Sequence, residues 1–363
     1  MKKILYGVQA TGNGHIARAN AMARALSGFD SIEVTWLYSG RPESELFGVG
    51  ENYQWRRGMT FATDGGRINL LRTVTTNNVV QFVRDVYRLD LSAWDLVICD
   101  FEPVIAWAAR LQGVPTLGIG HQYAFQYDVP YEGGNLLSNL FLQKFAPVTQ
   151  GLGLHWHHFN QAILPPIADL DGQSRQPAKQ GKYVVYLPFE DQQFVLSLLR
   201  QIRGATFYVY GPGLSRFDSE GHIQTRPLSR VGFKQDLVDA EGVICNTGFE
   251  LISECLLMGT KVLTKPLAGQ VEQISNAAAL RQLGYATVLD RWSPEPIRDW
   301  IRDGVNVQVS YPKVHERIAR WIVEGQRESV AELAGQLWSS VHEVRNSDRT
   351  AADAGDWTGR RAG

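Results

Sequence analysis

The sequence Asn-Thr-Gly-Phe-Glu-Leu-Ile-Ser-Glu-Cys-Leu-Leu-Met-Gly occupies residues 246–259 and directly follows a short apolar run, Gly242–Cys245. A strand that turns through Thr247 and Gly248 into an amphipathic helix leaves backbone N–H groups unpaired at the positive end of that helix. Such a helix end binds phosphate or diphosphate groups. Glu254 lies about 9 Å further along the helix axis, within reach of a ribose diol beyond the phosphates. The stretch therefore predicts a strand–turn–helix unit with a phosphate site at the turn.

A loop that contains proline and glycine follows this helix and leads to Glu272 and Gln273. A carboxylate accepts hydrogen bonds and an amide both donates and accepts them, which suits sugar hydroxyls. We expect these two side chains to hold a sugar, and Asn276 to cap or bridge the helix that runs to Leu283. Together the residues predict a binding site for a nucleotide sugar.

The composition is that of a soluble globular protein with two domains. A chain of 363 residues exceeds one ordinary core, and apolar residues make up 44% and charged residues 20% of it. The 36 basic residues nearly balance the 37 acidic ones, so nothing indicates non-specific binding to nucleic acid.

The cysteines and the amino terminus favour a cytoplasmic protein. Cys99, Cys245 and Cys255 lie in apolar settings without metal-ligand spacing, as buried thiols do in a reducing compartment. The first residues predict a strand and a Gly-rich turn rather than a signal peptide. No apolar run reaches the roughly 18 residues that a membrane span needs.

The first half of the chain alternates predicted strands and helices. Strands are expected at residues 4–8, 32–38, 95–99 and 116–119, and helices at 16–26 and 103–112. This order predicts βαβ units around a parallel sheet, and such sheets bind ligands outside the carboxyl ends of their strands. Three polar loops follow strands there, at Thr11–His15, Asp100–Glu102 and His121–Gln122. We expect an active site at that edge.

The second half repeats this pattern. Strands are expected at residues 183–187, 206–210 and 242–245, and helices at 192–203, 234–239, 249–258 and 296–303 and from 314 onwards. The sequence thus predicts a first domain over residues 1–166, a linker at 167–182 rich in Pro, Gly, Gln and Ser, and a second domain over 183–345. Residues 346–363 are small, polar and charged, and we expect a disordered tail.

The sequence resembles the GT-B-fold glycosyltransferases, most closely the MurG-like enzymes and the UDP-glycosyltransferases. The residues that carry the resemblance are the loop Gly12–His15, the helix from Gly248 to Glu254, and the Glu-Gln-x-x-Asn-Ala run at 272–277. The resemblance follows the element order over most of the chain and is specific only between Phe233 and Gly284. It implies two Rossmann-like α/β domains that face an interdomain cleft, with the acceptor in the first domain and the donor in the second.

The resemblance also implies roles for individual residues. Thr247 and Gly248 would hold the pyrophosphate, Glu254 the ribose, and Glu272 and Gln273 the donor sugar. Phe233 matches the place where backbone groups of the family meet the base, and Gly14 falls on the donor side of the amino-terminal loop. No cofactor or metal ion is implied.

The sequence departs from the family pattern at two places. Leu187–Glu190 stands where MurG-like enzymes carry a Gly-rich loop, which puts the phosphate contacts of that loop in doubt. The loop Gly12–His15 also lacks the proline that often follows it.

His15 is the predicted catalytic base, since imidazole titrates near the working pH. Asp100 could accept a hydrogen bond from its other nitrogen and fix the tautomer, as in the UDP-glycosyltransferase branch. Glu102 is the rival to Asp100 as partner or base, and Asn13 and His121 are further candidates on the acceptor side. The alternative for His15 is that it merely caps the loop.

Two other kinds of site are disfavoured. Gly12, Gly14 and Ala17 also match a dinucleotide-binding loop, but the strand at 32–38 does not end in the acidic residue which that fingerprint needs. The run His155–Phe159 contains a His-x-His pair without an evident third metal ligand. We expect a structural strand there and no metal.

Two apolar groups leave the acceptor undefined. One is an apolar stripe at helical spacing, which predicts a part of the core, an acceptor groove or a contact with a membrane surface. The other is an aromatic loop, whose rings would stack on a sugar or an aglycone or simply pack against the protein. The stripe consists of Leu136, Leu137, Leu140, Phe141 and Phe145, and the loop carries Tyr123, Phe125, Tyr127 and Tyr131.

The sequence as a whole predicts an inverting glycosyltransferase of the hexosyl type. Its donor would be a UDP sugar, and its acceptor hydroxyl, of unknown identity, would belong to a saccharide or a lipid-linked molecule, the latter with peripheral membrane contact. A nucleotide-sugar 2-epimerase and a non-catalytic protein that binds nucleotide sugars are the alternatives.

Overall fold

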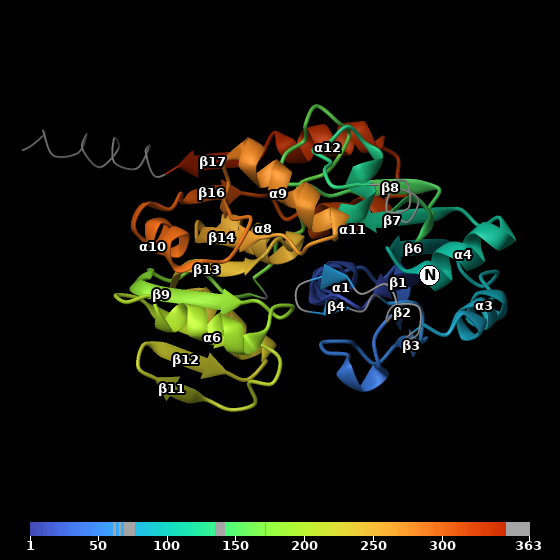
Figure 1. Cartoon of the computed structure of the whole chain (residues 1–363). Coiled ribbons are helices and arrows are strands. Elements are labelled where there is room, and N and C mark those ends of the chain that lie inside the picture. The colour runs from blue at the N-terminus through green and yellow to red at the C-terminus, as the bar shows by residue number, and fades with distance from the viewer. Residues whose placement is uncertain (61–62, 65–66, 69–76, 135–141, 171, 346–363) are drawn as a thin grey trace, which may run out of the picture.

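A computed structural model describes residues 1–60, 63–64, 67–68, 77–134, 142–170 and 172–345. Figure 1 shows two twisted sheets, each flanked by helices. The first sheet is parallel throughout, and its strands lie in the order β3 (Tyr53–Trp55), β2 (Ile32–Ser39), β1 (Lys2–Gln9), β6 (Leu96–Asp100), β7 (Thr116–Gly120) and β8 (Gln150–Gly153). Its central strands are apolar and buried, as strands covered on both faces must be.

The second sheet has the same arrangement with one added edge strand. Its strands lie in the order β11 (Asp218–Glu220), β12 (Ile223–Arg226), β10 (Thr206–Tyr210), β9 (Lys179–Tyr186), β13 (Ala240–Asn246), β14 (Lys261–Lys265) and β15 (Thr287–Val288), and only β11 is antiparallel to its neighbour. Strand order reverses beside the first strand of each domain, between β1 and β6 and between β9 and β13. A ligand crevice forms at such a switch point.

Helices cover the sheets, and the loops at these switch points connect strands to the helices that follow them. They are α1 (Asn13–Leu26), α3 (Val79–Arg88), α4 (Pro103–Gln112), α6 (Gln192–Arg200), α7 (Arg230–Leu237), α8 (Phe249–Met258), α9 (Val271–Leu283), α10 (Pro294–Asp303), α11 (Val314–Val323) and α12 (Val330–Trp338). Short 3-10 helices lie at η1 (Glu43–Glu45) and η2 (His121–Gln126), and two-stranded pairs at β4 (Thr63–Asp64) with β5 (Arg67–Ile68) and β16 (Val307–Ser310) with β17 (His342–Arg345).

The sequence explains where several helices begin and end. Pro103 starts α4 in the first turn, where its missing N–H is no loss, and the Glu102 side chain caps that turn. α8 ends at Gly259, whose φ of 64° is a conformation that glycine adopts without steric cost. α8 is therefore fixed at its carboxyl end by a glycine cap.

One apolar core runs between the two domains. It includes Ile16 of α1, Phe249 of α8 and Ile318 of α11, all buried. The C-terminal helix α11 packs against α1 (Figure 1). The indole N–H of Trp338, in α12, donates to the Ile163 carbonyl oxygen at 2.7 Å. The chain thus returns from the second domain to the first, and the domains are in contact.

The element order and the fold class predicted from the sequence are confirmed, and one strand is wrong. β8 ends at Gly153, and residues 155–159 form bends and a turn instead of a strand. The ring Nδ1 atoms of His157 and His158 accept hydrogen bonds from the backbone N–H groups of Phe159 and Asn160. These side-chain bonds satisfy the backbone locally and replace a strand ladder.

Other predictions from the sequence agree with the structure only in part. β9 begins at Lys179, so it takes in the end of the segment expected as linker. Phe145 of the apolar stripe is buried, whereas Leu136, Leu137, Leu140 and Phe141 lie outside the described residues, as does the tail from 346. Among the described helices, none is both long and apolar enough to span a membrane.

Candidate functional site

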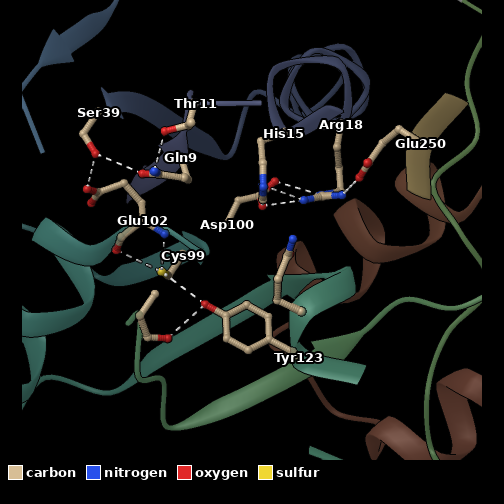
Figure 2. Close-up of polar contacts among 12 residues, drawn as sticks. Gln9, Thr11, His15, Arg18, Ser39, Cys99, Asp100, Glu102, Tyr123 and Glu250 are labelled. Carbon is tan, nitrogen blue, oxygen red and sulfur yellow. Dashed lines mark hydrogen bonds and ion pairs between the residues drawn. The ribbon is translucent and has the colours of Figure 1, made fainter. Parts of the chain in front are cut away.

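The first part of the site lies at the switch point of the first sheet. His15 stands in the first turn of α1, directly after β1, and Asp100 is the last residue of the neighbouring strand β6. Parallel neighbours end at the same sheet edge, so the two side chains meet, with His15 Nδ1 at 2.7 Å from Asp100 Oδ1 (Figure 2). Asp100 is 0% exposed and the His15 side chain 14%. The structure brings the two predicted residues together.

Arg18, one turn after His15 on α1, is a member of this site that the sequence reasoning missed. Its Nε donates to Asp100 Oδ2 at 2.8 Å and its Nη2 to Oδ1 at 2.6 Å, in a bidentate pair with 1% exposure of the arginine side chain. Burial would raise the pKa of Asp100, but the charges of Arg18 and His15 hold that pKa below its ordinary value. The carboxylate is therefore ionised beside His15.

The hydrogen-bonding capacity of Asp100 determines the tautomer of His15. An ionised Asp100 only accepts, so a bare Nδ1 at 2.7 Å from Oδ1 would set two lone pairs against each other. Nδ1 therefore carries the hydrogen, although Arg18 Nη2 also lies 2.9 Å away. The basic lone pair is then on Nε2, where a substrate hydroxyl could meet it.

Glu102 belongs to a separate polar group. Its buried carboxylate accepts from the N–H groups of Val104 at 2.9 Å and Ile105 at 2.7 Å, and from Ser39 Oγ at 2.5 Å. Burial raises the pKa of Glu102 to about 7, against these hydrogen bonds, which lower it. Figure 2 shows this group apart from His15 and Asp100. The Glu102 side chain therefore caps the amino terminus of α4.

The second part of the site is the turn between β13 and α8. Gly248 is the N-cap of α8, makes no side-chain cap, and has open space where a Cβ would lie. The Thr247 N–H donates to Gln273 Oε1 at 3.2 Å, and the same oxygen accepts from Leu267 N at 3.0 Å. Gln273 thus ties the turn between β13 and α8 to the loop before α9.

Two other predicted donor-side residues, Glu254 and Phe233, contact residues of the second domain. Glu254 forms an ion pair with Lys234 of α7, and both side chains are buried. Phe233 packs edge-on against Tyr186 and Tyr210, with ring centroids 5.4 and 5.2 Å apart. Glu254 is therefore a neutralised, buried carboxylate and not a solvated helix residue, a feature that the sequence alone could not distinguish.

Residues of the two domains contact each other across the site. The ring nitrogens of His121 lie 2.8 Å from the Leu154 carbonyl oxygen and 2.6 Å from Asn276 Oδ1, and its ring stacks on Phe249 at 3.9 Å. Asn276 Nδ2 donates to the Thr247 carbonyl oxygen at 3.1 Å. His121 of η2 is thereby joined to the turn at the start of α8.

Two weaker contacts cross the same interface. Gln122 Nε2 donates to Glu272 Oε2 at 3.1 Å, and Asn13 Nδ2 donates to the Tyr186 hydroxyl at 3.2 Å. Asn13 and His121, predicted on the acceptor side, thus each touch a residue of the second domain. Among the described residues, no three His, Cys, Asp or Glu side chains are grouped as metal ligands would be.

Several solved structures share this architecture at low sequence identity. MurG of Acinetobacter baumannii is 17% identical, with a TM-score of 0.50 over 83% of this chain and 90% of its own. UGT2 of Phytolacca americana, solved with UDP-2-fluoro-glucose and pterostilbene, is 12% identical, with a TM-score of 0.55 over 93% and 99%. UGT89C1 of Arabidopsis thaliana, solved with UDP, is 12% identical, with a TM-score of 0.56 over 93% and 100%. These likenesses establish the GT-B fold.

A search of curated proteins finds no match. The family model described as glycosyl transferase family 1 matches residues 2–303, which is most of the chain. With two Rossmann-like domains meeting at their switch points, the chain belongs to glycosyl transferase family 1.

Proposed function

We propose that this glycosyltransferase inverts the anomeric centre as it moves a hexose from a UDP sugar to a hydroxyl of a saccharide or lipid-linked acceptor. The observation that carries the proposal is the His15–Asp100 pair, whose Nδ1–Oδ1 distance is 2.7 Å. This pair belongs to the first domain, and Arg18 beside it contacts Glu250 in the first turn of α8. A base and an anion-binding helix end thus meet at one interface.

The proposed reaction is a single displacement. His15 Nε2 takes the proton of the acceptor hydroxyl while the hydroxyl oxygen attacks the anomeric carbon from the side opposite the diphosphate. The bond from that carbon to the diphosphate oxygen breaks, and attack from the opposite face inverts the centre. Asp100 stabilises the imidazolium that forms, because it is held as a carboxylate.

The leaving group would be stabilised at the amino terminus of α8. Open space at Gly248 leaves room there, and fixed N–H dipoles at a helix end stabilise negative charge that develops in a transition state. Gln273 supports the site through the Thr247 N–H. Glu254 would bind the ribose, Glu272 the sugar and the Phe233 segment the base. The UDP-containing ligands of two structurally similar proteins support uracil as that base.

Isothermal titration calorimetry with UDP, GDP and dTDP tests the donor site. We expect one nucleotide, UDP, to bind the wild type and to bind Glu254→Gln at least tenfold more weakly, because the ribose loses a charged acceptor. Glu295→Gln, an exposed position on α10, is the control and should bind as the wild type does. If no nucleotide binds, or if Glu254→Gln binds equally well, the donor site is wrongly assigned.

A His15→Ala variant tests the base separately. We expect turnover to fall by about 10²- to 10⁴-fold while UDP affinity stays unchanged, because a general base acts only on the chemical step. The exposed His342 of β17 supplies the control variant His342→Ala. Full turnover in His15→Ala would contradict the proposed role.

A further inference from the structure

We propose that Arg18 and Glu250 are positioning residues that support the His15–Asp100 pair across the domain interface. The inference rests on the proposed function, since it assigns further residues to the support of its base. Its basis is a chain of contacts that runs from His15 through Asp100 and Arg18 to Glu250, in which the last residue belongs to the other domain (Figure 2).

Arg18 links the two carboxylates in this series of contacts. Its Nε and Nη2 hold the two oxygens of Asp100, and its Nη1 donates to Glu250 Oε1. The guanidinium is buried, so water cannot replace either carboxylate. Burial lowers the pKa of Arg18, but Asp100 and Glu250 together raise it above its ordinary value, which keeps the arginine charged.

Glu250 changes the net charge of the groups beside His15. Asp100 and Arg18 alone sum to zero, so they give little net support to a positive charge on His15. With Glu250 the three groups sum to −1, and this net negative charge favours the imidazolium that forms when His15 takes a proton. The carboxylate that makes the difference comes from α8, across the domain interface.

The first turns of α1 and α8 must approach closely for this contact to form. A Cβ at Gly14 would collide with the Glu250 carboxylate, so glycine is the residue that allows the approach. Glu250 lies two residues after Gly248, at the same helix end that is proposed to hold the diphosphate. Donor binding and support of the base would therefore involve the same helix.

The test uses Glu250→Gln, which removes the charge and keeps the shape, with Glu250→Asp as the conservative variant and Glu295→Gln as the control. We expect Glu250→Gln to lower kcat by about tenfold, as loss of one supporting charge would. The affinity for UDP and the KM for the donor should not change, and Glu250→Asp should recover part of kcat.

A second readout does not depend on turnover. The Nδ1 proton of His15, assigned by its absence in His15→Gln, should give a downfield NMR resonance that shifts in Glu250→Gln and stays in place in Glu295→Gln. An unchanged resonance overturns the inference even if the protein transfers no sugar. Weaker donor binding with an unchanged resonance would make Glu250 a donor ligand instead.

Discussion

At the scale of the residue, Asp100 and Glu102 are neighbours in sequence with opposite electrostatic settings. Asp100 is paired with Arg18 and His15, and its pKa lies below the ordinary value, whereas burial raises the pKa of Glu102 to about 7. A carboxylate that supports an imidazolium must stay ionised near neutral pH. The surroundings of Asp100 meet this requirement, whereas Glu102 caps the amino terminus of α4.

The raised pKa of Glu102 gives a prediction about stability. The folded protein holds this proton more tightly than the unfolded chain, so the contribution is fully present below pH 4.5 and is lost as the pH rises towards 7. Relative to Glu102→Gln, whose amide does not titrate, the wild type should lose up to roughly 3 kcal/mol of unfolding free energy over that range. Urea denaturation of both proteins at pH 4.5, 6 and 7.5 measures the difference. A difference that stays constant with pH would contradict the prediction.

At the scale of the element, the contact between α1 and α8 depends on Gly14. We expect Gly14→Ala to push the Glu250 carboxylate off Arg18 and to lower kcat about as much as Glu250→Gln does, although every charge is retained. The control is Gly335→Ala in α12, where a Cβ would lie in open space. Steady-state kinetics of both variants decide the matter. Equal activity of the two variants would show that the approach of the helices is not limiting.

The sequence predicts those elements whose signals are local. Apolar runs and the turn at Thr247–Gly248 give β13 and α8, and polar residues after two neighbouring strands give the His15–Asp100 pair, because parallel strands end at one edge. The Arg18–Glu250 pair has no local signal, since it joins residues 232 positions apart. The one visible clue is an arginine on the face of α1 that otherwise carries buried Ile16, Ala19 and Met22.

The predicted strand at His155–Phe159 failed for a different physical reason. Alternation of large side chains is typical of a strand, but the rings of His157 and His158 capture nearby backbone N–H groups. Phe159 and Asn160 also have φ values of 48° and 59°, which end any strand. Such competition depends on the positions of individual atoms and is not visible in the pattern of residue types.

At the scale of the whole molecule, the continuous core makes the two domains behave as one unit. Trp156, at the end of the first domain, is fully buried, stacks on Phe249 with ring centroids 4.9 Å apart, and donates its indole N–H to Ser253 Oγ of α8 at 2.8 Å. Apolar contacts carry most of this interface, and a buried indole N–H needs its partner. Loss of that partner should therefore reduce the stability of the whole chain and not of one domain alone.

Two serines allow a matched test of this coupling. Ser253 Oγ and Ser197 Oγ each donate to a carbonyl oxygen in their own helix, but only Ser253 also accepts from Trp156. Ser253→Ala leaves the indole N–H buried and unpaired, so we expect the unfolding free energy to fall by about 1–3 kcal/mol. Ser197→Ala, on the exposed face of α6, should change it by less than about 0.5 kcal/mol. Urea unfolding followed by tryptophan fluorescence and by circular dichroism measures both. Because the interface joins the domains, the two signals should shift together in Ser253→Ala; a shift confined to one of two separate transitions would mean that the domains unfold independently.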